Sequence, residues 1–236
     1  MTRHIAAFIF LTSALFAQES GVTPKVCPSG ILSIADCPER GCGGVSDAFL
    51  NLAKNRTDTP SAASIQKMTV AQIKQIPQPK KWKTGDSRDS LHAPGREGTP
   101  VQLTGFLKIV KKGSGESCNC DLTSAADTDI HLVMVGKLSD PEKRSVTAEV
   151  TPRVRAAGHT NWTVGNVNDL QGKLVRLSGW LMLDTAHLPH PVLLPDEPPR
   201  RPLKRATNWE VHPILKIEGC NATVSQCQAG QGFQEF

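Results

Sequence analysis

Two stretches of the chain repeat the same alternation of apolar and polar residues around a central glycine. They are Val101–Leu107, with the sequence VQLTGFL, and Val175–Leu181, with the sequence VRLSGWL. Alternation of this kind is typical of a strand with one buried face, and a glycine inside a strand indicates a sharp bend or the close approach of another backbone. We therefore expect two bent strands of a small closed barrel.

Further strand patterns fall between and after the two copies, each bounded by turn residues. The chain predicts five strands, at 101–110, 129–135, 145–151, 173–183 and 208–217. Pro152 ends the third strand, and a weakly helical segment, 162–170, precedes the fourth. The fold class we expect is mainly β, a five-stranded barrel with one short helix.

This order, with its bent first and fourth strands, is that of the OB-fold, a Greek-key barrel. The phrase Gly172–Trp180, GKLVRLSGW, resembles the fourth strand of that fold. The resemblance covers residues 99–220, and it implies that the loops after the first and fourth strands flank a binding face. Another small β-barrel or sandwich is the alternative.

The first residues have the pattern of a secretory signal peptide. A short positive region is followed by an apolar stretch, Ile5–Phe16, and by a small residue, Ala17, where we expect cleavage. The alternative is a buried N-terminal helix or an uncleaved anchor. After loss of residues 1–17 nothing predicts stable membrane insertion, so we expect a secreted or periplasmic protein.

Residues 18–98 form an accessory segment that we expect to be irregular, partly helical and packed on the barrel. Ser46 or Asp47 is a candidate cap for a helix at 48–54, and Thr69 for one at 70–74. The barrel domain is expected at 99–220 and a short tail at 221–236.

The chain has seven cysteines, all after the signal peptide. In an oxidising compartment these predict three disulfides and one free thiol. Cys118 and Cys120 are too close in sequence to pair without strain, so at least one should reach a distant partner, with Cys220 and Cys227 as candidates. A zinc site made by Cys37, Cys42, Cys118 and Cys120 is the alternative.

The net charge of +5 is mildly basic and does not by itself indicate a nucleic-acid binder. Cations nevertheless gather in the two loops and after the third strand, and Trp180 could stack on a ligand. These candidate ligand-binding residues are Lys111, Lys112, Arg153, Arg155, Trp180, Arg200, Arg201, Lys204 and Arg205. They lead us to expect a binding module for a protein or for an anionic polymer, either nucleic acid or acidic saccharide. The absence of tyrosine weakens nucleic acid, since few aromatic rings remain for stacking on bases.

Acid and imidazole groups supply a second hypothesis. Asp129 and His131 stand two apart on one predicted strand, and Glu210 and His212 on another, so each pair shares a face. Asp129, His131 and His212 are candidate ligands for zinc or manganese, with Glu149 or Glu210 as general base of a hydrolase. In that hydrolase Arg153 or Arg155 would hold a phosphate or carboxylate. Otherwise each histidine merely hydrogen-bonds its neighbouring acid. A structural envelope-associated protein without a ligand is the third hypothesis.

Overall fold

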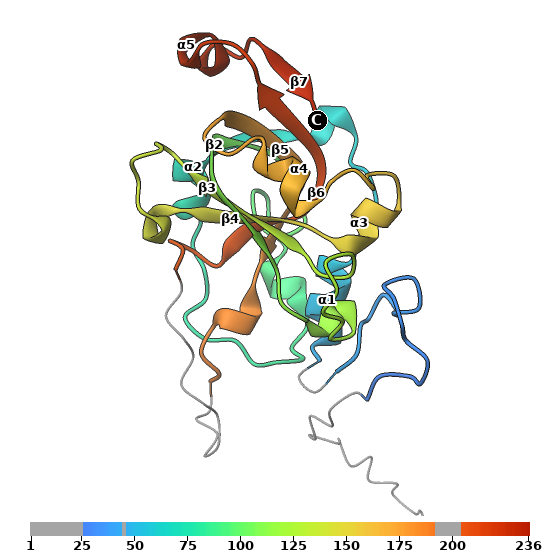
Figure 1. Ribbon diagram of the computed structural model, residues 1–236. Helices are drawn as coiled ribbons and strands as arrows, with labels where there is room; N and C mark the ends of the chain where they lie inside the picture. The colour runs from blue at the N-terminus through green and yellow to red at the C-terminus, as the bar shows by residue number, and fades with distance from the viewer. Residues whose placement is uncertain (1–25, 44–45, 192–203) are drawn as a thin grey trace, which may run out of the picture.

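The computed structural model describes residues 26–43, 46–191 and 204–236 (Figure 1). The predicted signal peptide and the candidate binding residues Arg200 and Arg201 lie outside the described residues. Within the described part, no helix is both long enough and apolar enough to cross a membrane.

Five strands close into the expected barrel. They run in the spatial order β2-β3-β4-β6-β5, and pairing of β5 with β2 closes the ring. Neighbours are antiparallel except β4 and β6, which are parallel. The strands are β2 (Pro100–Lys112), β3 (Ile130–Val135), β4 (Val146–Val150), β5 (Leu174–Leu183) and β6 (Trp209–Cys220). The fold class is therefore confirmed as a mainly β, OB-like barrel.

Two short helices, not one, connect β4 to β5. The predicted segment contains α4 (Val164–Asn168), and before it α3 (Pro152–Ala156) begins at the proline that ends the strand. Proline suits the first turn of a helix because its missing N–H would be unpaired there anyway. The Thr151 hydroxyl caps this helix by accepting from the backbone N–H of Val154.

The two copies of the sequence repeat lie side by side. Their centres pair across the antiparallel β2–β5 ladder, with Leu103 opposite Leu177. The glycine of the second copy admits another backbone, because a Cβ on Gly179 would lie 2.1 Å from the carbonyl oxygen of Pro213 on β6. The glycine of the first copy admits a helix, because a Cβ on Gly105 would lie 2.9 Å from a methyl group of Val70. Both glycines thus allow close packing, as expected for glycine in a strand.

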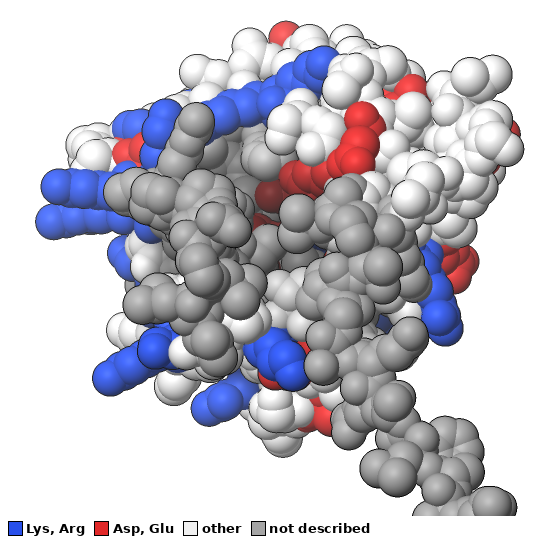
Figure 2. Space-filling model, turned by 90° about the horizontal axis from the view of Figure 1, so that it is seen from below, with Lys and Arg blue, Asp and Glu red and all other residues white. Residues whose placement is uncertain are grey.

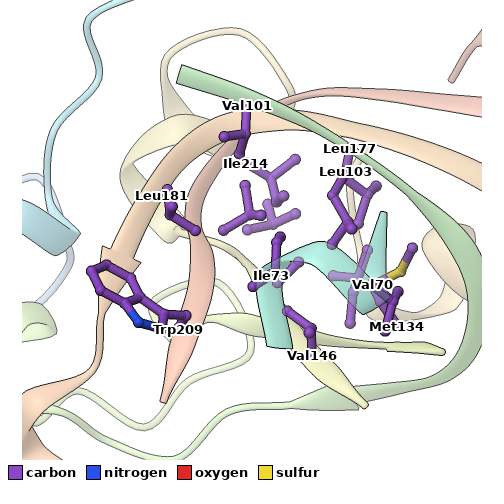
Figure 3. Close-up of a cluster of buried hydrophobic side chains, with 14 of the residues drawn as sticks. Val70, Ile73, Val101, Leu103, Met134, Val146, Leu177, Leu181, Trp209 and Ile214 are labelled. Atoms are coloured by element: carbon purple, nitrogen blue, oxygen red, sulfur yellow. The ribbon is translucent and has the colours of Figure 1, made fainter. Parts of the chain in front are cut away.

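The inside of the barrel is one apolar core (Figure 3). Alternate residues of the strands point inward, for example Leu103, Leu177 and Ile214, each fully buried. The helix α2 (Val70–Lys74) adds Val70 and Ile73 to the same cluster. The accessory segment therefore contributes to the barrel core.

The predicted caps of the accessory segment are present. The Asp47 carboxylate accepts from the first turn of α1 (Ala48–Lys54), and Thr69 forms a capping box with Gln72 at α2. The remaining α-helix and strands were not predicted: β1 (Gln66–Thr69) pairs parallel to β2, and after α5 (Val224–Gln228) the chain returns as β7 (Phe233–Glu235) beside β6. Single-turn 3₁₀ helices are η1 (Ala62–Ser64), η2 (Arg88–Leu91), η3 (Ser117–Asn119), η4 (Glu142–Arg144) and η5 (Thr185–His187).

Three disulfides form and leave one buried thiol, Cys118, as predicted. The bonds are Cys27–Cys42, Cys37–Cys120 and Cys220–Cys227. The candidate partners were wrong: Cys120 bonds to Cys37, because the loop 26–43 packs on η3, and Cys220 bonds within the tail. Three of the four cysteines of the alternative zinc site form disulfides and cannot bind zinc; only Cys118 is a free thiol.

Candidate functional site

A cleft of about 500 Å³ lies on the outer face of β3 and β4. Ile130 and Leu132 point into the core, so alternation turns His131 and Val133 outward, where they line the cleft. The opposite wall comes from the accessory segment, with Leu50 and Lys54 of α1. Seen from the end at which α1 lies, the molecule has a band of acidic atoms near the middle of the face, with lysine and arginine mostly towards the rim (Figure 2). The site is thus enclosed between the barrel wall and the segment packed on it.

The sheet register brings the predicted acid and imidazole residues together. His131 on β3 stands directly opposite Glu149 on β4. Glu210 on β6 stands opposite Thr147 on the same face of β4, and His212 follows two residues later. Asp129 immediately precedes β3, on the His131 side of the strand. Five of the residues chosen from sequence therefore meet on one outer face.

Glu149 lies between the two histidines. Its Oε1 is 3.6 Å from Nε2 of His131, and its Oε2 is 3.2 Å from Nδ1 of His212. Nδ1 of His212 is also 3.2 Å from Oε1 of Glu210. Asp129, Glu149, Glu210 and His212 are at most 3% exposed, whereas the His131 side chain is 30% exposed at the cleft. The cluster therefore runs from the cleft wall into the protein.

Burial and neighbouring charges shift the pKa values of the cluster. Burial alone would raise the pKa of Glu149, but His131 and His212 together hold it well below its ordinary value. Burial would lower the pKa of His212, but Glu149 and Glu210 raise it to about 10. For Asp129, burial and then the charge of Glu116 raise the pKa to about 6. Such opposed shifts are typical of functional sites.

Several buried atoms of the cluster have no hydrogen-bond partner among the described residues. They are Asp129 Oδ2, His131 Nε2 and His212 Nε2, whereas Oε2 of Glu149 faces Nδ1 of His212 at 3.2 Å. Most buried polar atoms in proteins have partners, so three exceptions on neighbouring potential metal ligands call for an explanation. Their oxygen and imidazole nitrogen atoms are those that zinc and manganese accept.

Two residues of the site had been given no role from sequence. Glu116 lies in the loop after β2, one of the two loops that the OB-fold resemblance places beside a binding face. Its Oε1 is 4.0 Å from Nε2 of His131. Its Oε2 is 2.5 Å from Nζ of Lys54, whose side chain is only 7% exposed. Burial alone would lower the pKa of Lys54, but Glu116 and other nearby acids raise it well above its ordinary value. Only the packing of α1 on the barrel reveals this pair.

Three of the predicted binding cations lie at the cleft. Lys204 lines it and is exposed, and Lys111 lines it in an ion pair with Glu142. Arg205 also reaches the cleft, but its guanidinium is held by Asp184 at 2.6 Å and Glu210 at 2.5 Å.

The other predicted binding residues in the described part of the chain make internal contacts. Nζ of Lys112 donates to the carbonyl oxygen of Thr123, Arg153 donates to Cys37 and Pro38, and Arg155 donates to Ala125, Ala126 and Thr128. Trp180 donates to the carbonyl oxygen of Asp58 and is covered by the guanidinium of Arg56, 3.4 Å from its ring centre. These donors hold the accessory segment and loops against the barrel.

Comparison with known proteins gives no match for this chain, whether among protein-family models, curated proteins or solved structures.

Proposed function

We propose that this protein is a metal-dependent hydrolase that binds a divalent ion, zinc or manganese, at the wall of the cleft. The ligands are Glu116, His131 and Glu149. The observation that carries the proposal is their convergence: one ligand atom from each lies within 4.8 Å of the others, and all three side chains line the cleft. Three protein ligands beside a cleft leave coordination positions open to water and substrate, as in catalytic zinc sites.

The chemistry follows from the open positions. Bound zinc would lower the pKa of a water to about 7 and so supply a hydroxide at neutral pH. That hydroxide would attack the carbon or phosphorus of the substrate as the bond to the leaving group breaks, with the proton of the water passing to solvent and the leaving group taking one up. Glu210, a candidate base from sequence, does not line the cleft, and it contacts His212 and Arg205, which it would hold in place.

With a divalent ion bound, the cleft would favour an anionic substrate, whereas without one five carboxylates and four Lys or Arg side chains line it among the described residues. Lys54, Lys111, Lys204 and Arg205 all line it, and Lys204 is the exposed one of the four. A bound divalent ion would add two positive charges to a cleft whose lining acids are already shared with cations. A phosphate ester or a carboxylate-bearing ester would therefore be attracted.

The first test is metal content. The protein is purified without chelators and analysed by inductively coupled plasma mass spectrometry, as wild type and as His131→Ala. His159→Ala is the matched control, because His159 stacks on Trp162 away from the cleft. We expect stoichiometric metal in wild type and control. Metal-free wild type after incubation with zinc and with manganese would overturn the proposal.

The second test is activity. Wild-type protein loaded with zinc or manganese is assayed on p-nitrophenyl phosphate, bis-p-nitrophenyl phosphate and p-nitrophenyl acetate. Hydrolysis should disappear with a chelator and return with the metal. We expect Lys204→Ala to raise KM for the phosphates with little change in kcat, since a cation at the rim acts on binding of the anion. Turnover that persists in chelator would contradict the proposed mechanism.

Binding of an anionic polymer or a protein by the basic loops stays a prediction. Most of the cations chosen for it are engaged internally, which is why we place the hydrolase first; Lys111 and Lys204 at the cleft are what favours it. Fluorescence anisotropy with a labelled single-stranded oligonucleotide and with an acidic oligosaccharide tests it. Binding that survives removal of the metal but is lost in Lys204→Ala would favour the binding module.

We also propose that the protein is exported, to the periplasm or the medium, with residues 1–17 removed. Its three disulfides support this, because such bonds persist in oxidising compartments. Mass spectrometry of the mature protein tests the cleavage after Ala17.

A further inference from the structure

The two histidines lie on opposite sides of Glu149. Each of its carboxylate oxygens faces a different ring, His131 from Oε1 and His212 from Oε2. The two oxygens therefore face in different directions, each towards another part of the cluster. Glu149 is the last but one residue of β4 and 3% exposed, and its backbone is fixed by the ladder to β3.

Two potential metal-binding sets share this carboxylate. The outer set is Glu116, His131 and Glu149, and the inner set is Asp129, Glu149 and His212. In each set the ligand atoms lie within 4.8 Å of one another, and no set among the described residues contains both histidines. One ion therefore does not account for both rings, contrary to the expectation from sequence that they could share one.

The inner set also has buried atoms that a bound ion would satisfy. Asp129, Glu149 and His212 are 1%, 3% and 0% exposed, and Oδ2 of Asp129 and Nε2 of His212 have no hydrogen-bond partner among the described residues. The remaining contacts fix the side chains: Asn119 donates to Oδ1 of Asp129, and Glu210 holds the ring of His212. Carboxylates that orient a histidine ring in this way are typical of the surroundings of metal ligands.

We propose that the site holds two divalent ions bridged by Glu149, an outer ion at Glu116 and His131 and an inner ion at Asp129 and His212. The inference rests on the proposed function for its outer ion and adds the inner one. Pairs of ions about 3.5–4 Å apart are a known arrangement in hydrolases, where they stabilise the attacking and leaving oxygens together. All three residues of the outer set line the cleft, whereas only Glu149 of the inner set does. Substrate entering the cleft would therefore meet the outer ion first.

The test is ion stoichiometry on the full chain. Metal-free protein is prepared with a chelator, loaded with Mn²⁺ or with Zn²⁺, desalted and analysed by mass spectrometry against protein concentration. Two ions per chain is the expected result. One ion would overturn the pair and leave the proposed function standing, whereas no ion would overturn both.

Electron paramagnetic resonance of the Mn²⁺-loaded wild type gives a second readout that needs no variant. Two ions bridged by one carboxylate should show exchange coupling, with loss of the six-line signal of an isolated Mn²⁺. The uncoupled signal at full loading would place the ions apart and overturn the bridge.

Variants then assign each ion. His131→Ala should remove the outer ion and Asp129→Asn the inner one, each leaving about one ion per chain, while Glu149→Gln should weaken both. The control Glu142→Gln, which pairs with Lys111 outside both sets, should keep two. Circular dichroism checks that each variant is folded. Loss of both ions, or of neither, in folded Asp129→Asn would contradict the assignment.

Discussion

The strands β3, β4 and β6 have an inner face, which points into the barrel, and an outer face, which points away from it and carries both proposed ions. Both faces are buried, but the inner face is apolar and the outer face is charged. On the inner face Leu132 and Ala148 are fully buried against other apolar side chains. On the outer face Glu149 and His212 are almost as deeply buried among charges, and Nε2 of His212 has no partner among the described residues. The inner face is closed by the barrel together with α2, whereas the outer face is covered by α1 and the loop that carries Glu116 and η3. Strand alternation therefore determines which residues face outward, and packing of the accessory segment buries those residues in a site.

The largest expected effect comes from releasing the accessory segment. Cys37 and Cys120 are 83 residues apart, and the bond joins the loop 26–43 to the loop that carries Glu116. Opening it in Cys37→Ser/Cys120→Ser should lower the free energy of unfolding by about 4 kcal/mol, because a long loop regains its entropy in the unfolded chain. Urea unfolding measures this, and metal analysis should show loss of the outer ion.

The matched control is the short disulfide of the tail. Cys220→Ser/Cys227→Ser opens a bond between residues only 7 apart, so the loss should be about 2 kcal/mol and the metal content should not change. Equal losses for the two pairs, with metal kept in both, would show that the accessory segment stays on the outer face without its bond.

Loss of apolar volume from the core, which the inner face lines, should lower the free energy of unfolding without changing metal binding. Leu177→Ala removes a fully buried side chain from the centre of the β2–β5 pair and should cost about 3 kcal/mol. Ion stoichiometry should remain that of wild type, because the side chain lies on the other side of the wall from the cluster. Urea unfolding and metal analysis of the same preparation check both statements. A folded Leu177→Ala protein that binds fewer ions would break the separation of the two faces.

Alternation and turn residues predicted the inner face well. The two glycine-centred strands, all five barrel strands and the caps at Asp47 and Thr69 follow from local sequence, because each depends on near neighbours. The short β1 was missed because only its pairing with β2 makes it a strand. The disulfide partner of Cys120 was missed because loop packing brings Cys37 to it.

The candidate site likewise has a part that local sequence predicts and a part that depends on contacts between distant segments. Pairs two residues apart, such as Asp129 with His131 and Glu210 with His212, could be placed on one face from sequence alone. Their convergence on Glu149 required the register of three strands. Glu116 and Lys54 come from a loop and from α1, so their place at the site depends on contacts between distant segments that no local pattern reports.

Removal of a buried charge from the outer face should stabilise the metal-free protein, whereas removal of apolar volume from the inner face should destabilise it. In metal-free protein at pH 7.5, Asp129→Asn should raise the free energy of unfolding by about 1 kcal/mol, because an ionised carboxylate no longer lies buried beside Glu116 and Glu149. The raised pKa, about 6 against 3.8, sets the pH dependence. Stability due to the protonated carboxyl is complete below 3.8 and is lost as the pH rises through about 6. The advantage of Asp129→Asn should therefore vanish near pH 4, as urea unfolding in chelator at both pH values can show.

The smallest effect concerns the thiol that lies under the cover of the outer face. Cys118 is 1% exposed, and burial raises the pKa of its thiol well above the ordinary value. A protonated, covered thiol reacts slowly, so Ellman's reagent should find no reactive thiol in the native protein and one per chain in urea without reductant. The rate in the native protein measures how often α1 and η3 separate from the barrel, since the reagent reaches Cys118 only when they do. Slow labelling that becomes slower still on addition of Zn²⁺ would show that the ion protects this thiol, either by holding the cover closed or by binding Cys118 together with Glu116 and Asp129. Fast labelling of the metal-loaded protein would mean that the outer face opens readily, and its charges would then be hydrated rather than buried.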